Sequence, residues 1–404
     1  MVVVAAVLAA IVTGTTDLLI VLVAIIAMIM LHELGHFLTA KWSHMKVTEY
    51  FLGFGPKLWS IHKGETEYGI KAIPAGGYVK IVGMSNLEEV DPADEPRAYR
   101  QQPFHNRLLV AVAGSAMHFI IAFVLIWAVL AVVGVPGPGT VEIGALTTWQ
   151  GPPSPARHAG LKAGDVIVSV DGRKVTTMGE VAQVTGTHPG RPVTMVVRQD
   201  GSLRKLVITP VDGHQVRFDG HQAVPAGSRS PGLIGVELTY APVHSDPVVA
   251  VGQSAVDLGR TVGESFSALG TVFSPHGLAS YFHDLVSARA AARAARSGTR
   301  PESIYGAVRT ATQGAQAGAG DLLIVLVSIN VFVGIVNLFP MLPLDGGHVV
   351  VAVYERLRSR RGRPYRADVA KLLPLAYAMV VFLGFIFFTS LYLDITHPVA
   401  NPFH

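Results

Sequence analysis

Long uninterrupted apolar runs dominate the pattern of hydrophobic and polar positions along the chain. Three of them, at 108–135, 322–343 and 372–393, contain no Asp, Glu, Lys or Arg. A bilayer has a hydrocarbon core of roughly 30 Å, which an α-helix crosses with about 20 apolar residues. Each run therefore predicts one transmembrane helix.

A fourth run occupies 18–31 and continues to residue 40, and its only ionisable residues are His32, Glu33 and His36. With it, the chain is predicted to be a polytopic α-helical membrane protein with about four transmembrane helices. Residues 1–12 are apolar but too short to span alone. They have no basic segment and no clear cleavage site, so no signal peptide is expected.

Composition supports a membrane protein. Of the 404 residues, 50% are hydrophobic and 15% are charged, and the mean hydropathy is +0.43. A soluble protein of this size carries more charge. There is no cysteine, so a metal site must use His, Asp or Glu. The formal net charge of +4 is too small to indicate nucleic-acid binding.

The distribution of Lys and Arg predicts the topology. Seven lie within 356–371 and nine within 41–107, whereas 1–31 and 394–404 contain none. Short loops rich in Lys and Arg stay in the cytoplasm. Both basic loops are therefore expected in the cytoplasm, and both termini and the long segment 136–321 are expected outside.

The sequence H-E-x-x-H stands at the end of the first span. His32 and His36 are four residues apart and share one face of a helix. Glu33 is rotated by about 100° from His32, a position that suits a base acting on water at a metal. Ionisable residues at membrane depth are functional by default. The alternative is a polar helix end satisfied by its neighbours.

A catalytic zinc site needs a third protein ligand, and the best candidate is Asp345. Pro340 and Pro343 break the preceding helix, and Gly346 and Gly347 let the backbone turn. Unwound backbone at membrane depth is tolerated where it is buried in protein or lines a wet cavity. Asp345 is alternatively the N-cap of the following helix, and both interpretations can hold together.

These motifs resemble those of the site-2 protease family of intramembrane zinc metalloproteases. The resemblance rests on H-E-L-G-H at 32–36 and on N-L-F-P-M-L-P-L-D-G-G at 337–347. Phe54-Gly55-Pro56, G-E-T-E-Y at 64–68 and P-A-G-G-Y-V-K at 74–80 are similar to the family's segment after the first span, which holds a membrane-associated β-hairpin. The resemblance covers nearly the whole chain.

The resemblance implies that His32, His36 and Asp345 bind Zn²⁺, that Glu33 is catalytic and that Asn337 contacts substrate. It also implies substrate binding by the β-hairpin, at Gly76 and Gly77.

Two further polar residues lie in the predicted spans. Asn330 precedes Asn337 by two helical turns, and a helix–helix hydrogen bond is at least as good an interpretation for it as substrate contact. Many family members have A-G-P-x-x-N where this chain has Ala113-Gly114-Ser115-Ala116-Met117-His118. His118 is expected to be a satisfied interior histidine outside the metal shell.

The segment 151–212 has the alternation of strands and turns typical of a β-rich domain. A-G-L-K-A-G-D-V-I at 159–167, followed by an alternating strand and Asp171-Gly172, resembles a PDZ domain of the bacterial protease type. Val193–Val197 and Leu206–Thr209 are further predicted strands, and 230–236 is a candidate for the last one. PDZ domains take extended peptides, often C-termini, onto a sheet edge. The alternative is a spacer that shields the protease.

After this domain, Arg289, Arg293, Arg296 and Arg300 recur at helical spacing among alanines. A solvated helix face is the default interpretation, and a helix lying on anionic lipid is the alternative.

The predicted organisation is therefore as follows. Residues 1–135 hold the first two spans, with the β-hairpin at about 47–84; 136–245 form an inserted extracytoplasmic PDZ (α+β) domain; 246–320 form a linker region outside or on the membrane surface; and 321–404 hold the last two spans.

A PDZ domain between the second and third spans resembles the bacterial regulator-of-sigma-E protease group. That resemblance implies regulated intramembrane proteolysis of a single-span anti-sigma factor already trimmed outside. The enzyme would lie in the bacterial inner membrane with its active site facing the cytoplasm. The alternatives are a catalytically idle PDZ-bearing scaffold, which the intact ligand set argues against, and a membrane-anchored conventional zinc peptidase, which the Pro-broken apolar span before Asp345 argues against.

Overall fold

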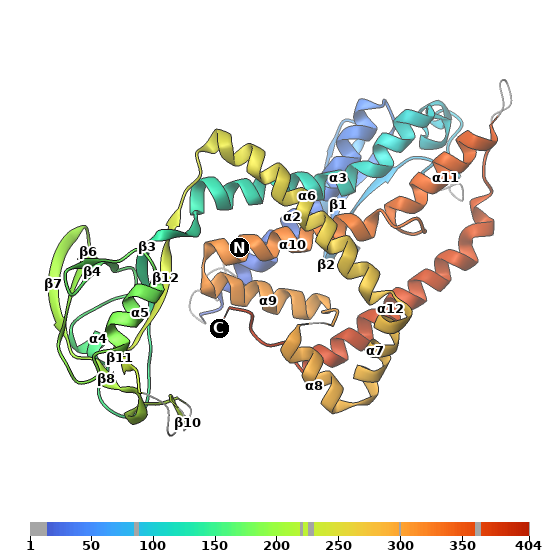
Figure 1. Cartoon of the computed structure of the whole chain (residues 1–404). Coiled ribbons are helices and arrows are strands. Elements are labelled where there is room, and N and C mark those ends of the chain that lie inside the picture. The colour runs from blue at the N-terminus through green and yellow to red at the C-terminus, as the bar shows by residue number, and fades with distance from the viewer. Residues whose placement is uncertain are drawn as a thin grey trace. The chain divides into compact units, whose positions relative to one another are not determined.

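The computed structural model of the 404-residue chain describes residues 14–84, 89–218, 221–224, 230–298, 300–359 and 365–403. The N-terminal segment 1–12 and part of the basic loop 356–371 lie outside these residues. The chain forms two compact units (Figure 1). One comprises residues up to Val129 together with those from Pro247 onward, and the other comprises Leu130–Asp246.

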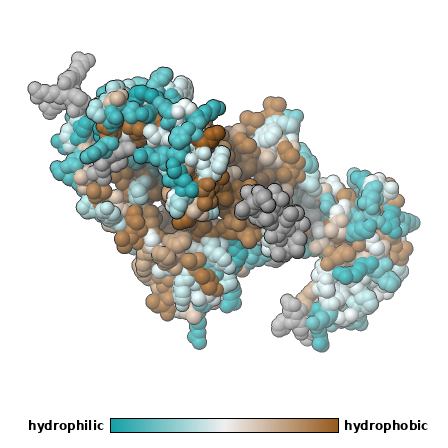
Figure 2. Space-filling model, turned by 180° about the vertical axis from the view of Figure 1, so that it is seen from behind, coloured by the Kyte–Doolittle hydropathy of each residue, from teal (hydrophilic) through white to brown (hydrophobic). Residues whose placement is uncertain are grey.

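Four helices of the first unit are long and apolar enough to cross a membrane. They are α2 (Thr16–Trp42), α3 (Phe104–Ala128, continued by the π-turn Val129–Val133), α10 (Ala319–Asn337) and α12 (Leu373–Thr396). This confirms the four predicted spans. Many of their large apolar side chains are exposed, and broad brown surfaces mark the helical unit in Figure 2.

The third span is shorter than the sequence predicted. It ends at Asn337 rather than at residue 343, and the chain then runs without helix to Leu344 before α11 (Asp345–Arg358) begins. Pro340 and Pro343 lie in this break, as predicted, because proline removes a backbone donor and clashes within a helix.

The segment after the first span forms the predicted β-hairpin from β1 (Val47–Lys63) and β2 (Thr66–Ile81). Both strands are bent, so residues 49–52 pair with 67–70 on one side and with 77–80 on the other, while 57–63 pair with 66–71. The hairpin is therefore a small curled sheet. Residues 77–80 form one of its edges.

Residues 247–317, which the sequence left largely unassigned, fold into four helices. Helices α6 and α9 pack against the spanning helices, α6 on α3 and α10, and α9 on α2 and α10. The helices are α6 (Pro247–Val272), α7 (Pro275–Val286), α8 (Ala288–Ser297) and α9 (Ile304–Ala317), and the short turns of this unit are η1 (Glu95–Arg97), η2 (Tyr99–Gln101) and η5 (Val369–Leu372).

The second unit is built on an antiparallel sheet with the strand order β12-β3-β4-β6-β7, and β5 pairs with β4. The strands are β3 (Val135–Leu146), β4 (Val166–Val170), β5 (Arg173–Lys174), β6 (Val193–Gln199), β7 (Ser202–Ile208) and β12 (Val236–Val243). The helices are α4 (Pro155–His158) and α5 (Met178–Gly186). The small elements are β8 (Val211–Asp212), η4 (Gly213–Gln215), β9 (Arg217–Phe218), β10 (His221–Gln222) and β11 (Gly232–Leu233).

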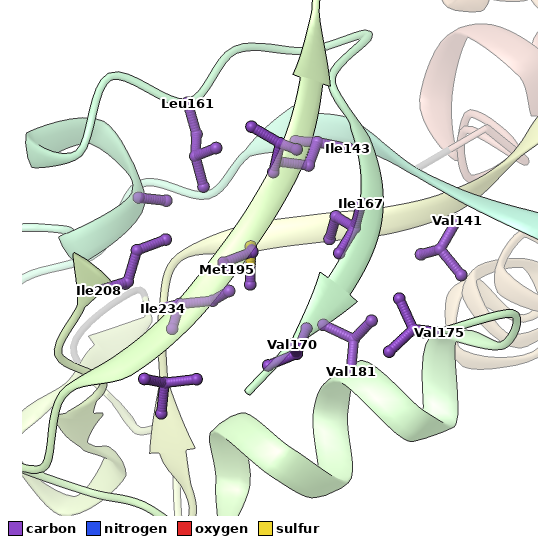
Figure 3. Packing of buried hydrophobic residues seen from close by; sticks show 13 residues of the cluster. Val141, Ile143, Leu161, Ile167, Val170, Val175, Val181, Met195, Ile208 and Ile234 are labelled. Atoms are coloured by element: carbon purple, nitrogen blue, oxygen red, sulfur yellow. The ribbon is translucent and has the colours of Figure 1, made fainter. Parts of the chain in front are cut away.

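The core of this unit lies between the sheet and α5. Ile143, Ile167 and Met195 project from three neighbouring strands and meet Val181 of the helix (Figure 3). A capping box begins the helix, because Thr177 accepts a hydrogen bond from the Glu180 backbone and the Glu180 side chain accepts one from Thr177.

Two strand predictions in this unit need correction. Strand β7 begins at Ser202 rather than Leu206, because its first residues pair with β6 although their side chains are exposed. Within 230–236 only Gly232–Leu233 form a strand, and it pairs with β8. The strand that completes the main sheet is β12, which pairs with β3.

Candidate metal centre and active site

Three side chains from two distant parts of the chain meet in the helical unit. One ligand atom each of His32, His36 and Asp345 lies within 4.8 Å of the others. Asp345 Oδ2 is 3.6 Å from His32 Nε2 and 3.3 Å from His36 Nε2. The two histidines lie one turn apart on α2, and Asp345 begins α11. The structure thus brings together the three residues that the sequence singled out as ligands.

The hydrogen bonds of these residues suit a metal. His36 Nδ1 lies 2.8 Å from the Val110 carbonyl, which only accepts, so this nitrogen carries the proton and Nε2 keeps its lone pair. Asp345 Oδ2 is buried and has no hydrogen-bond partner among the described residues. An unpaired buried carboxylate oxygen is costly, whereas two imidazoles and one carboxylate are a catalytic zinc donor set.

A glycine leaves room beside the two histidines. A Cβ at Gly114 on α3 would overlap His36 Nε2 and His32 Cε1, and would lie 2.7 Å from His32 Nε2. The absence of a side chain therefore keeps open the space next to both ligating nitrogens. The sequence analysis quoted Gly114 within a motif and gave it no role.

The backbone at Asp345 decides between its two interpretations. Leu344 occupies the N-cap position, Asp345 is the first helical residue, and no side chain caps this end. The N-cap interpretation is therefore wrong. Gly346 and Gly347 allow a close approach, because a Cβ at either position would overlap backbone atoms of the 338–342 segment.

Glu33 lies beside the β-hairpin. A Cβ at Gly77 would be 3.2 Å from Glu33 Cγ and 3.1 Å from Met30 Sδ. The Tyr50 hydroxyl donates a 2.8 Å hydrogen bond to the Met30 carbonyl. The sheet edge at 77–80 therefore passes directly along the turn of α2 that carries the glutamate.

Comparison with known proteins gives the family. The sequence model described as "Peptidase family M50" matches residues 20–383, which is most of the chain. The chain belongs to peptidase family M50. This is the site-2 protease family that the motifs resemble, and the protein is an intramembrane zinc metalloprotease.

Two relatives illustrate the similarity. The chain is 34% identical over 422 residues to the zinc metalloprotease Rip1 of Mycobacterium tuberculosis, covering 95% of this chain and 98% of the relative. It is 32% identical over 414 residues to Rip1 of Mycolicibacterium smegmatis, covering 93% and 96%.

The other polar residues of the M50 spans are arranged around this centre. Asn330 is fully buried, its Oδ1 lies 2.9 Å from His118 Nδ1, and its Nδ2 donates to the Leu326 carbonyl at 2.8 Å. The helix–helix interpretation of Asn330 is confirmed, as is a paired interior His118. The His118 and His32 rings are 4.9 Å apart, but His118 is not part of the three-residue metal group.

Asn337 is the last residue of α10. Its side chain is half-buried. Its carboxamide forms no hydrogen bond to the described residues, and it remains available to a substrate backbone.

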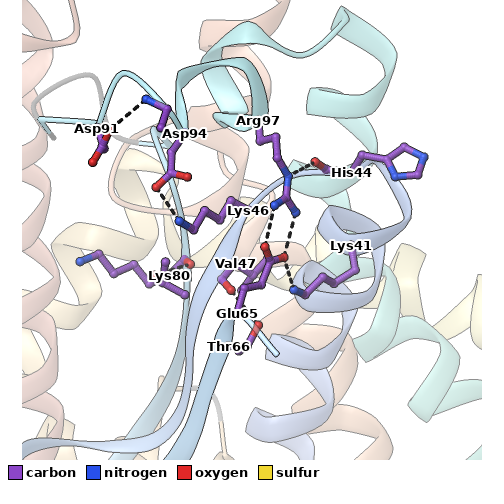
Figure 4. A network of polar contacts seen from close by, with 12 residues as sticks. Lys41, His44, Lys46, Val47, Glu65, Thr66, Lys80, Asp91, Asp94 and Arg97 are labelled. Atoms are coloured by element: carbon purple, nitrogen blue, oxygen red, sulfur yellow. Dashed lines mark hydrogen bonds and ion pairs between the residues drawn. The ribbon is translucent and has the colours of Figure 1, made fainter. Parts of the chain in front are cut away.

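An ion-pair cluster anchors the hairpin of this M50 peptidase to the end of α2 (Figure 4). Glu65, at the turn between the strands, pairs with Lys41 at 2.5 Å and with Arg97 at 2.6 Å. The Arg97 guanidinium, helped by Lys41, lowers the pKa of Glu65 to about 2. Lys46 binds Asp94 at 2.6 Å in the same region, so the strands are tied to the helix that carries the histidines.

A buried ion pair joins α11 to α3, and the sequence gave no signal for it. Arg107 Nη1 lies 2.7 Å from Glu355 Oε2, and the two side chains are 8% and 3% exposed. Glu355 also accepts a 2.7 Å hydrogen bond from the Ala367 backbone. Removing one partner of a buried pair typically costs about 3–5 kcal/mol, so this contact holds the helix that begins with Asp345.

Proposed function

We propose that His32, His36 and Asp345 bind the zinc and that Glu33 is the catalytic base. The proposed reaction is peptide-bond hydrolysis in a single-span membrane protein, within or next to its membrane segment. The observation that carries this proposal is the meeting of three donor atoms within 4.8 Å beside a glutamate on the same helical turn.

Each residue has a chemical task in this proposal. Zinc, when bound, supplies Lewis-acid chemistry that polarises a peptide carbonyl and acidifies water. Glu33 takes a proton from the attacking water at its carboxylate and passes it to the leaving amine. The Val110 carbonyl fixes the ring of His36 through Nδ1, and Asp345 contributes negative charge.

The substrate must unwind before it is cut, because a helix hides its carbonyls in hydrogen bonds. Residues 77–80 pair within the hairpin on one side only, as far as the described residues show. We infer that the unwound segment adds to this edge as a further strand. Gly76 and Gly77 then border the substrate next to Glu33, and the Asn337 carboxamide binds its backbone.

The proposed substrate class is an anti-sigma factor with a single span, trimmed beforehand by another protease. The enzyme is proposed to lie in the bacterial inner membrane with the active site facing the cytoplasm and the 130–246 unit outside. The Lys and Arg distribution supports this orientation, and the strand and turn motifs of that unit support its assignment as a PDZ domain.

Single-cysteine labelling tests the orientation, because the chain has no cysteine of its own. Leu357 on α11 is 80% exposed, and Ser202 is exposed at the start of β7. An impermeant maleimide added to intact cells is expected to label Ser202→Cys and to spare Leu357→Cys until the membrane is permeabilised. The opposite pattern would overturn the topology.

We propose that the PDZ domain acts as a gate that excludes substrates with long extracytoplasmic parts. Strands β3 and β12 pair with each other, so both must be removed together to avoid leaving an open edge. Replacing 135–243 with a flexible Gly/Ser linker is expected to allow cleavage of an untrimmed substrate.

Recruitment of substrate by edge-strand capture would have the opposite signature, since the same deletion would then reduce cleavage of the trimmed substrate. Zinc content, which the deletion should leave unchanged, serves as the control. Continued refusal of the untrimmed substrate by the zinc-loaded variant rules out gating.

A further inference from the structure

Helix α8 lies at the membrane boundary that the fourth span defines. Its buried Ala291 packs with Tyr281 and with Leu393 of α12, and the Ala295 carbonyl accepts a 3.1 Å hydrogen bond from Ala400. Leu393 is the last residue of the apolar run of α12, three residues before the helix ends, or about 4.5 Å along the axis. The helix therefore sits where hydrocarbon gives way to lipid headgroups.

The two faces of α8 differ sharply. Ala291, Ala294 and Ala295 are buried, whereas Arg289, Arg293 and Arg296 share the opposite, exposed face. Among the described residues, no carboxylate lies within ion-pair distance of these three guanidinium groups, and only the Arg296 Nε makes a hydrogen bond, to the Ala292 carbonyl of its own helix. Around the small Ala288 and Ala292, the arginines line an open hollow of about 610 Å³.

Arg300 does not belong to this face, which corrects the four-residue pattern expected from the sequence. The helix ends at Ser297, and Gly298 turns the chain with a φ of 62°. Arg300 is 1% exposed, lies 2.8 Å from Asp394 Oδ1 and donates to the His397 carbonyl at 2.7 Å. The three remaining arginines are therefore those without an ionic partner.

The preceding helix, α7, reaches hydrocarbon depth. The ring of Phe282 lies 6.0 Å from that of Phe385, which is well inside the fourth span. Phe282 and Val286 are nevertheless 51% and 84% exposed, an exposure that lipid accommodates and water does not. An apolar helix followed directly by a cationic face is the pattern of a protein surface that lies in the membrane interface.

We propose that Arg289, Arg293 and Arg296 bind the phosphate groups of anionic phospholipids in the leaflet at the C-terminal end of α12. Guanidinium groups bind phosphate oxygens through two parallel hydrogen bonds, and this face supplies three of them at the depth of the headgroups. The electrostatic benefit of cations at a helix C-terminus accounts for Arg296 alone, and a solvated face leaves the exposed apolar residues of α7 unexplained. The inference does not depend on the orientation of the protein in the membrane.

Fluorescence quenching in nanodiscs tests this site on the full-length protein. A fluorophore is attached to Ala288→Cys, an exposed position at the edge of the arginine face. The nanodiscs are phosphatidylcholine with a small fraction of nitroxide-labelled lipid, either phosphatidylglycerol or phosphatidylcholine. We expect the anionic lipid to quench at least about threefold more strongly than the zwitterionic lipid at equal mole fraction.

Matched variants separate this site from general electrostatics. R289Q/R293Q/R296Q is expected to bring the ratio of anionic to zwitterionic quenching to about one, while R289K/R293K/R296K keeps it clearly above one because the charge remains. R157Q/R173Q/R191Q removes three exposed arginines from the other unit and should leave the ratio unchanged.

Three results would overturn the proposal. They are equal quenching by the two lipids in the parent protein, a lipid preference that survives in the glutamine triple variant, and loss of the preference on addition of millimolar inorganic phosphate, which would indicate a site for a free anion.

Discussion

Asp345→Ala is expected to lose most of the bound zinc. The residue supplies the only carboxylate of the three-residue group, and its buried Oδ2 has no hydrogen-bond partner among the described residues. As a first-turn residue that caps nothing, it contributes only about 0.3–1 kcal/mol to stability through the helix dipole. Zinc per protein and thermal unfolding would be measured on the same purified sample. Full zinc occupancy in a folded variant would remove Asp345 from the ligand set.

A second variant reaches the same loss with every ligand in place. Gly114→Ala puts a Cβ where it would overlap the His36 and His32 rings, so zinc occupancy should fall although no donor has been removed. The neighbouring Ser115→Ala is the matched control, because Ser115 is equally buried and its hydroxyl has no hydrogen-bond partner among the described residues. Equal zinc content in the two variants would contradict the role given to Gly114.

Glu33→Gln is expected to keep zinc and to lose about 10²–10⁴-fold in cleavage rate. The substitution preserves the shape of the side chain beside Gly77 and removes only its ability to accept a proton. The three ligand atoms belong to other residues, so the metal should remain. The rate would be measured on a reconstituted single-span substrate, with zinc content as the internal control. A glutamine variant that cleaves at the normal rate would show that another group is the base.

The features with strong local signals could be predicted from the sequence. Apolar runs gave the four spans because lipid imposes a minimum length. H-E-x-x-H placed His32 and His36 on one helix face, and the lone Asp345 after a Pro-broken run gave the third member of the group. Their meeting depends on tertiary packing, which here rests on the resemblance to a family as well as on residue spacing.

Contacts between distant segments could not be predicted in this way. The Arg107–Glu355 pair joins two helices that show no matching pattern in the sequence. The curled pairing of the hairpin depends on bends within β1 and β2 that alternation alone does not encode. The spacing of the arginines indicated one helical face, yet it could not show that the helix stops at Ser297 and that Arg300 turns inward to meet Asp394.

The central claim is that this M50 peptidase cuts a membrane-spanning substrate with a zinc ion held by the three residues. The direct measurement uses purified protein in proteoliposomes with a single-span substrate, before chelation, after removal of metal, and after addition of zinc. Mass spectrometry of the products maps the cut. The prediction is cleavage within or next to the apolar segment, lost on chelation and restored by zinc. Cleavage that persists in the metal-free protein, or a cut confined to a soluble part of the substrate, would contradict it.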